Sequence, residues 1–203
     1  MWELTLEHLR LTAIAVVIGF AISFPLGVLA YRHRRTYGPI TAVTGILYTI
    51  PSLALFMMLG PVTGTLSVTT AEIGLVSYTL LIIIRNTVAG FRGVPEDVKE
   101  AARGMGYTAR QSLWKVELPL AVPAIVAGVR IATVTTIGLV TVTSLIGHGG
   151  LGIYILQGLS RLDSTLTLTG AVLSMFLAVS ADRILVIVER RSTPWAQTRA
   201  RAS

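Results

Sequence analysis

The chain has 203 residues, of which 53% are hydrophobic and only 13% are charged, and its mean hydropathy is +0.72. Soluble domains carry about 25% charged residues, so this composition excludes an ordinary soluble protein and predicts an integral membrane protein. The chain has no cysteine, which excludes disulfides, thiolate metal sites and cysteine nucleophiles. A net charge of +7 would indicate nucleic-acid binding in a soluble protein, but little of this chain is soluble, so we expect no nucleic-acid partner.

Apolar stretches long enough to cross a bilayer recur along the chain. A spanning helix needs about 20 apolar residues. Five stretches meet this length, and they cover residues 11–30, 39–59, 71–90, 119–146 and 166–188. The predicted fold class is therefore all-α integral membrane, with about five transmembrane helices in a single domain over residues 1–203. The first ten residues lack the basic start of a signal peptide, so we expect the first span to be retained.

The distribution of Lys and Arg predicts the orientation, because these residues gather in cytoplasmic loops. Segments 31–38, 92–118 and 189–203 hold three, five and four of them, whereas the intervening loops hold only Arg10 and Arg161. We therefore expect the N-terminus outside and the C-terminus in the cytoplasm. The polar end of the chain includes Trp195, which either rests at the membrane surface or belongs to a disordered tail.

The loop between the third and fourth spans carries the strongest local pattern. Pro95, followed by two acidic residues, is typical of the start of a helix. Gly104 and Gly106 predict the end of that helix. The sequence therefore predicts a first short helix on the inner face of the membrane.

A second short helix is predicted directly after these glycines. Thr108 with Gln111 three residues later has the pattern of a capping box. We expect this helix to end at Leu118-Pro119, where the fourth span starts. The whole loop 92–118 then forms a helix–Gly–helix bracket that can pass a partner's motion to the spans.

Glu100, Ala101 and Ala102 are followed at fixed spacing by Gly106, Val116, Leu118 and Pro119. This pattern resembles the EAA loop of binding-protein-dependent ABC importer permeases, in which the position of Val116 is most often isoleucine. The resemblance implies that the loop docks into a groove on an ATP-binding subunit. It also implies that these seven residues couple the spans to that ATPase, and we expect the bracket to present its small alanines to the partner.

Four segments resemble the osmoprotectant branch of the same family. These segments are IPSLAL at 50–55, RNT at 85–87, EAARGMG at 100–106 and GHGGLG at 147–152. The resemblance implies import of glycine betaine, choline, carnitine or proline betaine. His148 departs from the branch, which usually has a small residue there. The methionine branch is similar in the glycine-rich segment but fits the 85–87 stretch less well.

The resemblance also implies the partners. It predicts an ATP-binding subunit that holds ATP and Mg, a second permease copy or paralogue, an extracytoplasmic solute-binding protein and membrane lipid. This chain itself has no nucleotide-binding motif and no cofactor is expected in it. The expected location is the bacterial inner membrane, with several membrane passes.

Candidates for a pathway or gate are scattered along the chain. Pro51 is expected to kink the second span. The glycine-rich segment with Gly147, Gly149, Gly150 and Gly152 follows a membrane helix and not a strand, so it is not a dinucleotide site. We expect either a tight turn or re-entrant piece after the fourth span, or an outer gate or docking point for a solute-binding protein.

Two arginines interrupt the apolar runs. Arg85, which precedes Asn86, and Arg130 are each expected to extend toward the inner headgroups. For both arginines the alternative is a structural pairing with Asp182. Arg85 and Asn86 are carried forward as pathway candidates, because charge in a span needs a structural or functional reason.

Three alternatives remain open from the sequence. The chain could import another small amine or an amino acid, or it could be a secondary transporter that works without an ATPase, although no internal repeat is visible. An intramembrane enzyme is disfavoured because His8, His33 and His148 are isolated and no catalytic constellation is present.

Overall fold

The computed structural model describes residues 1–192, and every regular element within that range is helical. The elements in chain order are α1 (Trp2–Arg32), α2 (Arg34–Thr49), α3 (Ser52–Thr63), α4 (Val68–Arg92), α5 (Glu96–Gly104), α6 (Ala109–Ser112), the π-helix η1 (Leu113–Glu117), α7 (Leu118–Val142), the 3₁₀-helix η2 (Thr143–Ile146), α8 (Gly152–Arg161) and α9 (Ser164–Ser192). The all-α prediction is confirmed. The interpretation of Trp195 falls outside the described residues.

Four helical stretches in residues 1–192 are long and apolar enough to cross a membrane, and they cover Trp2–Arg32, Val68–Arg92, Ala109–Ile146 and Ser164–Arg191. The bent pair α2 and α3 can supply a fifth span. The four straight stretches begin or end several residues beyond the predicted spans. Hydropathy detects only the apolar part of a helix, whereas the hydrogen-bonded backbone continues into polar residues at its ends.

The second predicted span, 39–59, is not one helix. The chain bends by 99° between α2 and α3. Pro51 has no N–H to donate and disfavours helical geometry at Ile50, which is extended with ψ of 129°. The hydroxyl of Tyr78 donates to the Ile50 carbonyl and so satisfies a backbone group that the break leaves free. The predicted kink at Pro51 is therefore a complete break.

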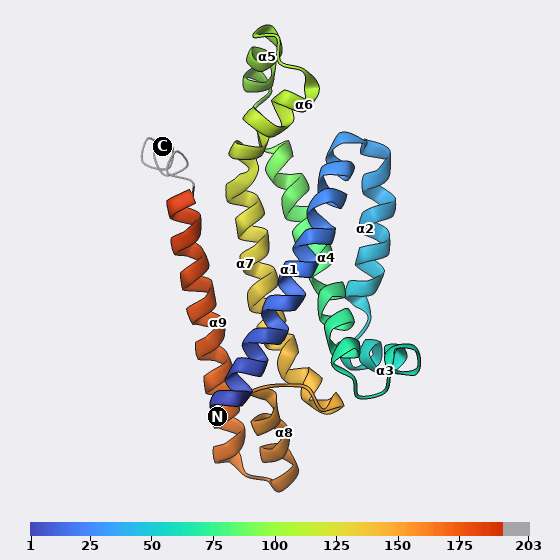
Figure 1. The fold of residues 1–203 in the computed structure, drawn as a ribbon, viewed down its shortest axis with the longest axis vertical. Coiled ribbons are helices and arrows are strands. Elements are labelled where there is room, and N and C mark those ends of the chain that lie inside the picture. Colours follow the sequence, from blue (N-terminus) through green and yellow to red (C-terminus); the bar gives the residue numbers. More distant parts are fainter. Residues whose placement is uncertain (193–203) are drawn as a thin grey trace.

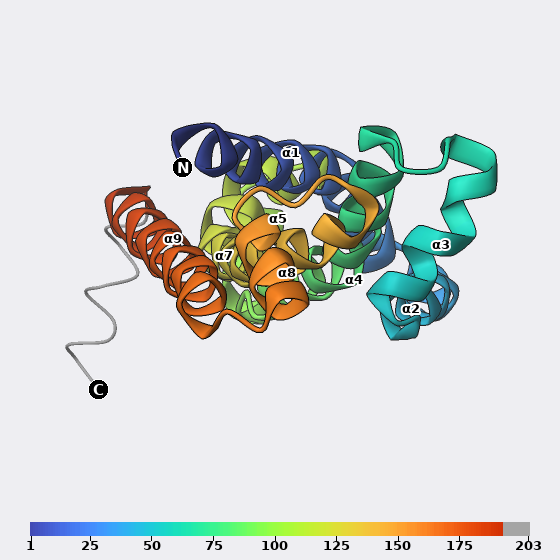
Figure 2. The same ribbon diagram turned by 90° about the horizontal axis from the view of Figure 1, so that it is seen from below.

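The most enclosed span is α4. Of the 18 most apolar consecutive residues of α4, 61% are buried, whereas the corresponding share in α9 is 6%. Small residues bring its neighbours close: a Cβ on Gly27 of α1 would meet Thr87, and one on Gly128 of α7 would meet Asn86. Figure 2 shows α9 beside α7, and α2 and α3 on the other side of α4.

The basic segments share one end of the molecule. Figure 1 shows the α1–α2 turn, the end of α4, the elements α5 and α6, and the last turns of α9 toward one end, with the N-terminus, α3 and α8 toward the other. The described segments that were predicted to be cytoplasmic thus lie on one side of the bundle. That this side faces the cytoplasm stays a prediction.

Candidate functional site

The segment predicted to couple to an ATPase stands beyond the long helices (Figure 1) and consists of α5, α6 and η1. We call residues 95–118 the coupling bracket. As predicted, α5 begins directly after Pro95. Glu96 accepts a hydrogen bond from Arg103 at 2.6 Å and pairs with Lys99 at 3.4 Å. The bond from Arg103 lowers the pKa of the Glu96 carboxyl.

A glycine turn separates the two helices of the coupling bracket. Gly106 has a φ of +82°, and no neighbouring atom stands where its Cβ would be. The N–H of Tyr107 donates to the carbonyl of Ala102 at 3.1 Å, which closes the end of α5 as in a Schellman motif. Glycine is therefore favoured here by the left-handed backbone and not by a lack of space.

The capping box is confirmed, because the Gln111 N–H donates to Thr108 Oγ1 at 3.3 Å and the Thr108 N–H donates to Gln111 Oε1 at 2.9 Å. The predicted helix end at Leu118-Pro119 is wrong. The helix continues through the π-helix η1 into α7, and the Leu118 N–H donates to the carbonyl of Leu113. A proline inside an α-helix clashes with the carbonyl four residues earlier, and the wider π-turn just before Pro119 lets the helix continue.

The coupling bracket exposes several apolar side chains together with an acid. Glu100 and Ala101 are exposed, as are Met105 (68%) and Tyr107 (36%). The expectation that both alanines face outward is wrong for Ala102, which is only 1% exposed. The helical period turns it inward, so its small size serves the packing of the bracket itself.

A buried carboxylate that the sequence analysis did not single out connects the coupling bracket to α1. Glu117 is 8% exposed; it accepts hydrogen bonds from the Tyr31 hydroxyl at 2.6 Å and from the Ser112 hydroxyl at 3.0 Å. The Tyr31 ring stacks on Phe91 with 5.0 Å between centroids, and Lys99 lies over it at 5.7 Å. The one sequence signal was an acid between Val116 and Leu118, directly before the predicted fourth span.

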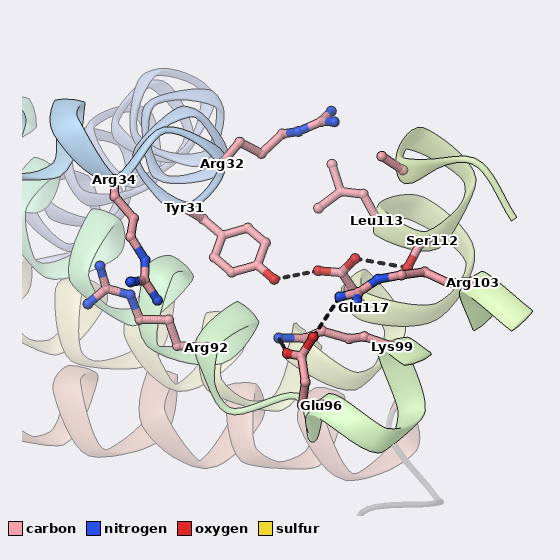
Figure 3. Close-up of a pocket in the computed structure, with 11 residues that line it drawn as sticks. Tyr31, Arg32, Arg34, Arg92, Glu96, Lys99, Arg103, Ser112, Leu113 and Glu117 are labelled. Atoms are coloured by element: carbon pink, nitrogen blue, oxygen red, sulfur yellow. Dashed lines mark hydrogen bonds and ion pairs between the residues drawn. The ribbon is translucent and has the colours of Figure 1, made fainter. Parts of the chain in front are cut away.

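A cleft of about 720 Å³ lies between the coupling bracket and the ends of α1, α2 and α4 (Figure 3). We call it the basic cleft, and its lining residues are Tyr31, Arg32, Arg34, Arg92, Glu96, Lys99, Arg103, Ala109, Ser112, Leu113 and Glu117. Among residues 1–192, no three His, Asp or Glu gather as metal ligands, here or elsewhere.

The glycine-rich segment at the opposite end is a tight turn, as one of its two interpretations predicted. Gly147 and Gly150 have positive φ, and a Cβ on Gly149 or Gly152 would collide with the backbone of η2 or α7. The Nε2 atom of His148 lies 2.9 Å from the Leu66 carbonyl and ties this turn to the α3–α4 loop. A role as an outer gate stays a prediction.

The remaining pathway candidates do not converge. Arg85 is exposed near the bracket end of α4, and Asn86 donates to the Ile82 carbonyl at 2.8 Å beside α7, away from the glycine turn. Arg130 does form the suggested pair with Asp182, at 2.9 Å, and also pairs with Glu189 at 2.9 Å.

Comparison with known families accounts for most of this arrangement. Residues 19–194 match the family described as binding-protein-dependent transport system inner membrane component. The chain belongs to this family. It is thus the membrane permease of an ABC importer, and the secondary transporter and the intramembrane enzyme are set aside.

Individual relatives of this permease are similar over nearly their whole length. The choline transport system permease protein OpuBB of Bacillus subtilis is 40% identical over 94% of this chain and 87% of that protein. The glycine betaine/carnitine/choline transport system permease protein OpuCB of the same organism is also 40% identical, over 93% and 86%. The osmoprotectant import permease protein OsmW of Salmonella typhimurium is 38% identical over 95% and 91%.

Solved structures agree with the fold of the permease. A chain of the inward-facing MetNI methionine ABC transporter matches with a TM-score of 0.85 and 27% identity, over 95% of this chain and 97% of that one. A chain of an amino acid ABC transporter matches with a TM-score of 0.70 at 20% identity, which supports the fold alone.

Proposed function

We propose that this permease admits a quaternary-amine compatible solute: glycine betaine, choline, carnitine or proline betaine. The observation that carries the proposal is the identity of 38–40% over more than nine-tenths of the chain to permeases named for choline, glycine betaine, carnitine and osmoprotectants. A solute-binding protein outside the membrane selects the solute, and the permease provides its path.

A second candidate substrate is another small amine or an amino acid. It is favoured by the 27% identity to a chain of a methionine transporter. Uptake of radiolabelled choline by cells that express the whole transporter separates the two candidates. Choline uptake that glycine betaine or carnitine competes with supports the first proposal, whereas uptake of radiolabelled methionine with no uptake of choline supports the second.

The assembly we propose has two permease subunits that form the path between them, two ATP-binding subunits that hold ATP and Mg, and a solute-binding protein. The coupling bracket faces the cytoplasm, and its exposed surface at Glu100, Ala101 and Met105 docks on an ATP-binding subunit. Closure of the ATPases then moves the bracket, and the continuous helix through η1 passes that motion to α7. The N-terminus lies outside and the C-terminus inside.

A charge reversal on the docking surface and a substitution at the glycine turn of the coupling bracket test this proposal. We expect Glu100→Arg and Gly106→Val each to lower solute uptake per ATP hydrolysed in proteoliposomes, while the permease still inserts in the membrane. The matched control is Glu3→Arg, since Glu3 is an exposed acid at the opposite end of the bundle. Unchanged uptake per ATP in both bracket variants would count against coupling through this surface.

A further inference from the structure

The basic cleft carries more positive charge than the chain itself neutralises. Its lining includes two carboxylates and five cations, which are Arg32, Arg34, Arg92, Lys99 and Arg103. Both carboxylates are already engaged. Glu96 is paired with Lys99 and Arg103, and Glu117 accepts from two hydroxyl groups. The remaining three arginines therefore give the cleft its unbalanced charge.

Two of these arginines point toward one another. Figure 3 shows the guanidinium groups of Arg34 and Arg92 converging on one side of the basic cleft. Arg92 lies over the ring of Tyr37 at 4.6 Å, which fixes its direction. Within residues 1–192 neither arginine has a carboxylate within ion-pair distance. Two unpaired guanidinium groups that line one cleft attract an anion, and their fork of donors suits phosphate oxygens.

The position of the basic cleft indicates where that anion comes from. Arg34 begins α2 just after the membrane-length helix α1 ends at Arg32, and Arg92 ends the membrane-length helix α4. Arginines at this level meet lipid headgroups, and tyrosines such as Tyr37 gather at the same interface. Further along α2 from Arg34, the side chains of Val43 (61%) and Ile46 (64%) are exposed, and they offer an apolar surface to the acyl chains of a lipid.

We propose that the basic cleft binds the phosphate headgroup of an anionic membrane phospholipid, with Arg34 and Arg92 as its principal contacts. Basic clefts at the ends of membrane helices suit such headgroups. The lipid would bridge the α1–α2 turn, the end of α4 and the coupling bracket, all of which line the cleft. The site depends on insertion in a membrane but not on the identity of the solute.

Native mass spectrometry of the full chain in detergent tests the proposal, with phosphatidylglycerol and phosphatidylcholine of the same acyl chains as probes. The wild-type chain should retain phosphatidylglycerol in preference to phosphatidylcholine. The double variant R34Q/R92Q should lose about 25-fold in affinity for phosphatidylglycerol, since each cation near a headgroup contributes on the order of fivefold. Both arginines are exposed, so the variant should fold.

Control variants and competitors identify the ligand. The double variant R110Q/K115Q removes two exposed cations of the coupling bracket that do not line the cleft, and it should keep the preference. The double variant R34K/R92K retains both charges and should keep most of the preference for phosphatidylglycerol. Equal loss in R34Q/R92Q and R110Q/K115Q would overturn the proposal in favour of general surface charge.

Two further results would also overturn it. Displacement of the lipid by millimolar inorganic phosphate would make the site one for free phosphate. An R34Q/R92Q variant that keeps its lipid preference but no longer co-purifies with the ATP-binding subunit would make the cleft a protein-docking surface. Resistance to inorganic phosphate, together with unchanged co-purification, would support the lipid site.

Discussion

The two ends of the helical bundle are held by different kinds of contact. At the bracket end, side chains make the connections, with Glu117 joining Tyr31 of α1 to Ser112 of α6. At the other end His148 also makes a side-chain bond, to the Leu66 carbonyl, but the backbone of the glycine turn lies against the preceding helix with no room for a side chain at Gly149 or Gly152. An end held by a few hydrogen bonds can change shape, whereas an end held by backbone packing resists it.

The largest expected effect is at the glycine turn. A Cβ at Gly149 would collide with the backbone of Ser144, so Gly149→Val should lower the free energy of unfolding by about 3 kcal/mol. Gly138→Val is the matched control, because no atom stands near its Cβ position. Thermal unfolding in detergent measures both, and similar losses in the two variants would contradict the packing difference.

Substitutions at the bracket end should lower the free energy of unfolding by less, and the loss should depend on how much of the hydrogen bonding is removed. Glu117→Ala leaves the hydroxyls of Tyr31 and Ser112 without their acceptor, and we expect a loss of about 2 kcal/mol in the free energy of unfolding. Glu117→Gln keeps an acceptor oxygen and should cost less. A double-mutant cycle with Tyr31→Phe measures the link to α1 directly, and a coupling energy near zero would show that this bond does not join the bracket to the bundle.

The smallest effect is expected at the surface of α5. Glu96 is exposed, and exposed ion pairs contribute little, so Glu96→Gln should leave the unfolding midpoint unchanged within error at neutral pH. Its pKa is lowered in the folded state from an ordinary value of 4.5, so any stabilisation is present above that pH and fades as the pH falls below it. A clear loss at pH 7 that persists at pH 3 would contradict a charge effect.

Several elements were predictable because their signals are local. The capping box needs only Thr108 and Gln111, and the turn after α5 needs only a glycine that accepts a positive φ, as Gly106 does. The break at Pro51 was foreseen as a kink only, because the sequence does not show that Tyr78 from another helix satisfies the carbonyl of Ile50. Tertiary support of this kind decides whether a bend becomes a break.

The sequence by itself determined the membrane class, the number of apolar stretches, the side shared by the basic segments and the pattern of the coupling bracket. These follow from composition, from the charge of each loop and from neighbouring residues. The tertiary structure alone decided that Ala102 faces inward, that Glu117 meets Tyr31, and that Arg34 and Arg92 line one cleft. Such contacts join residues far apart in the chain, and their geometry exists only after the helices have packed.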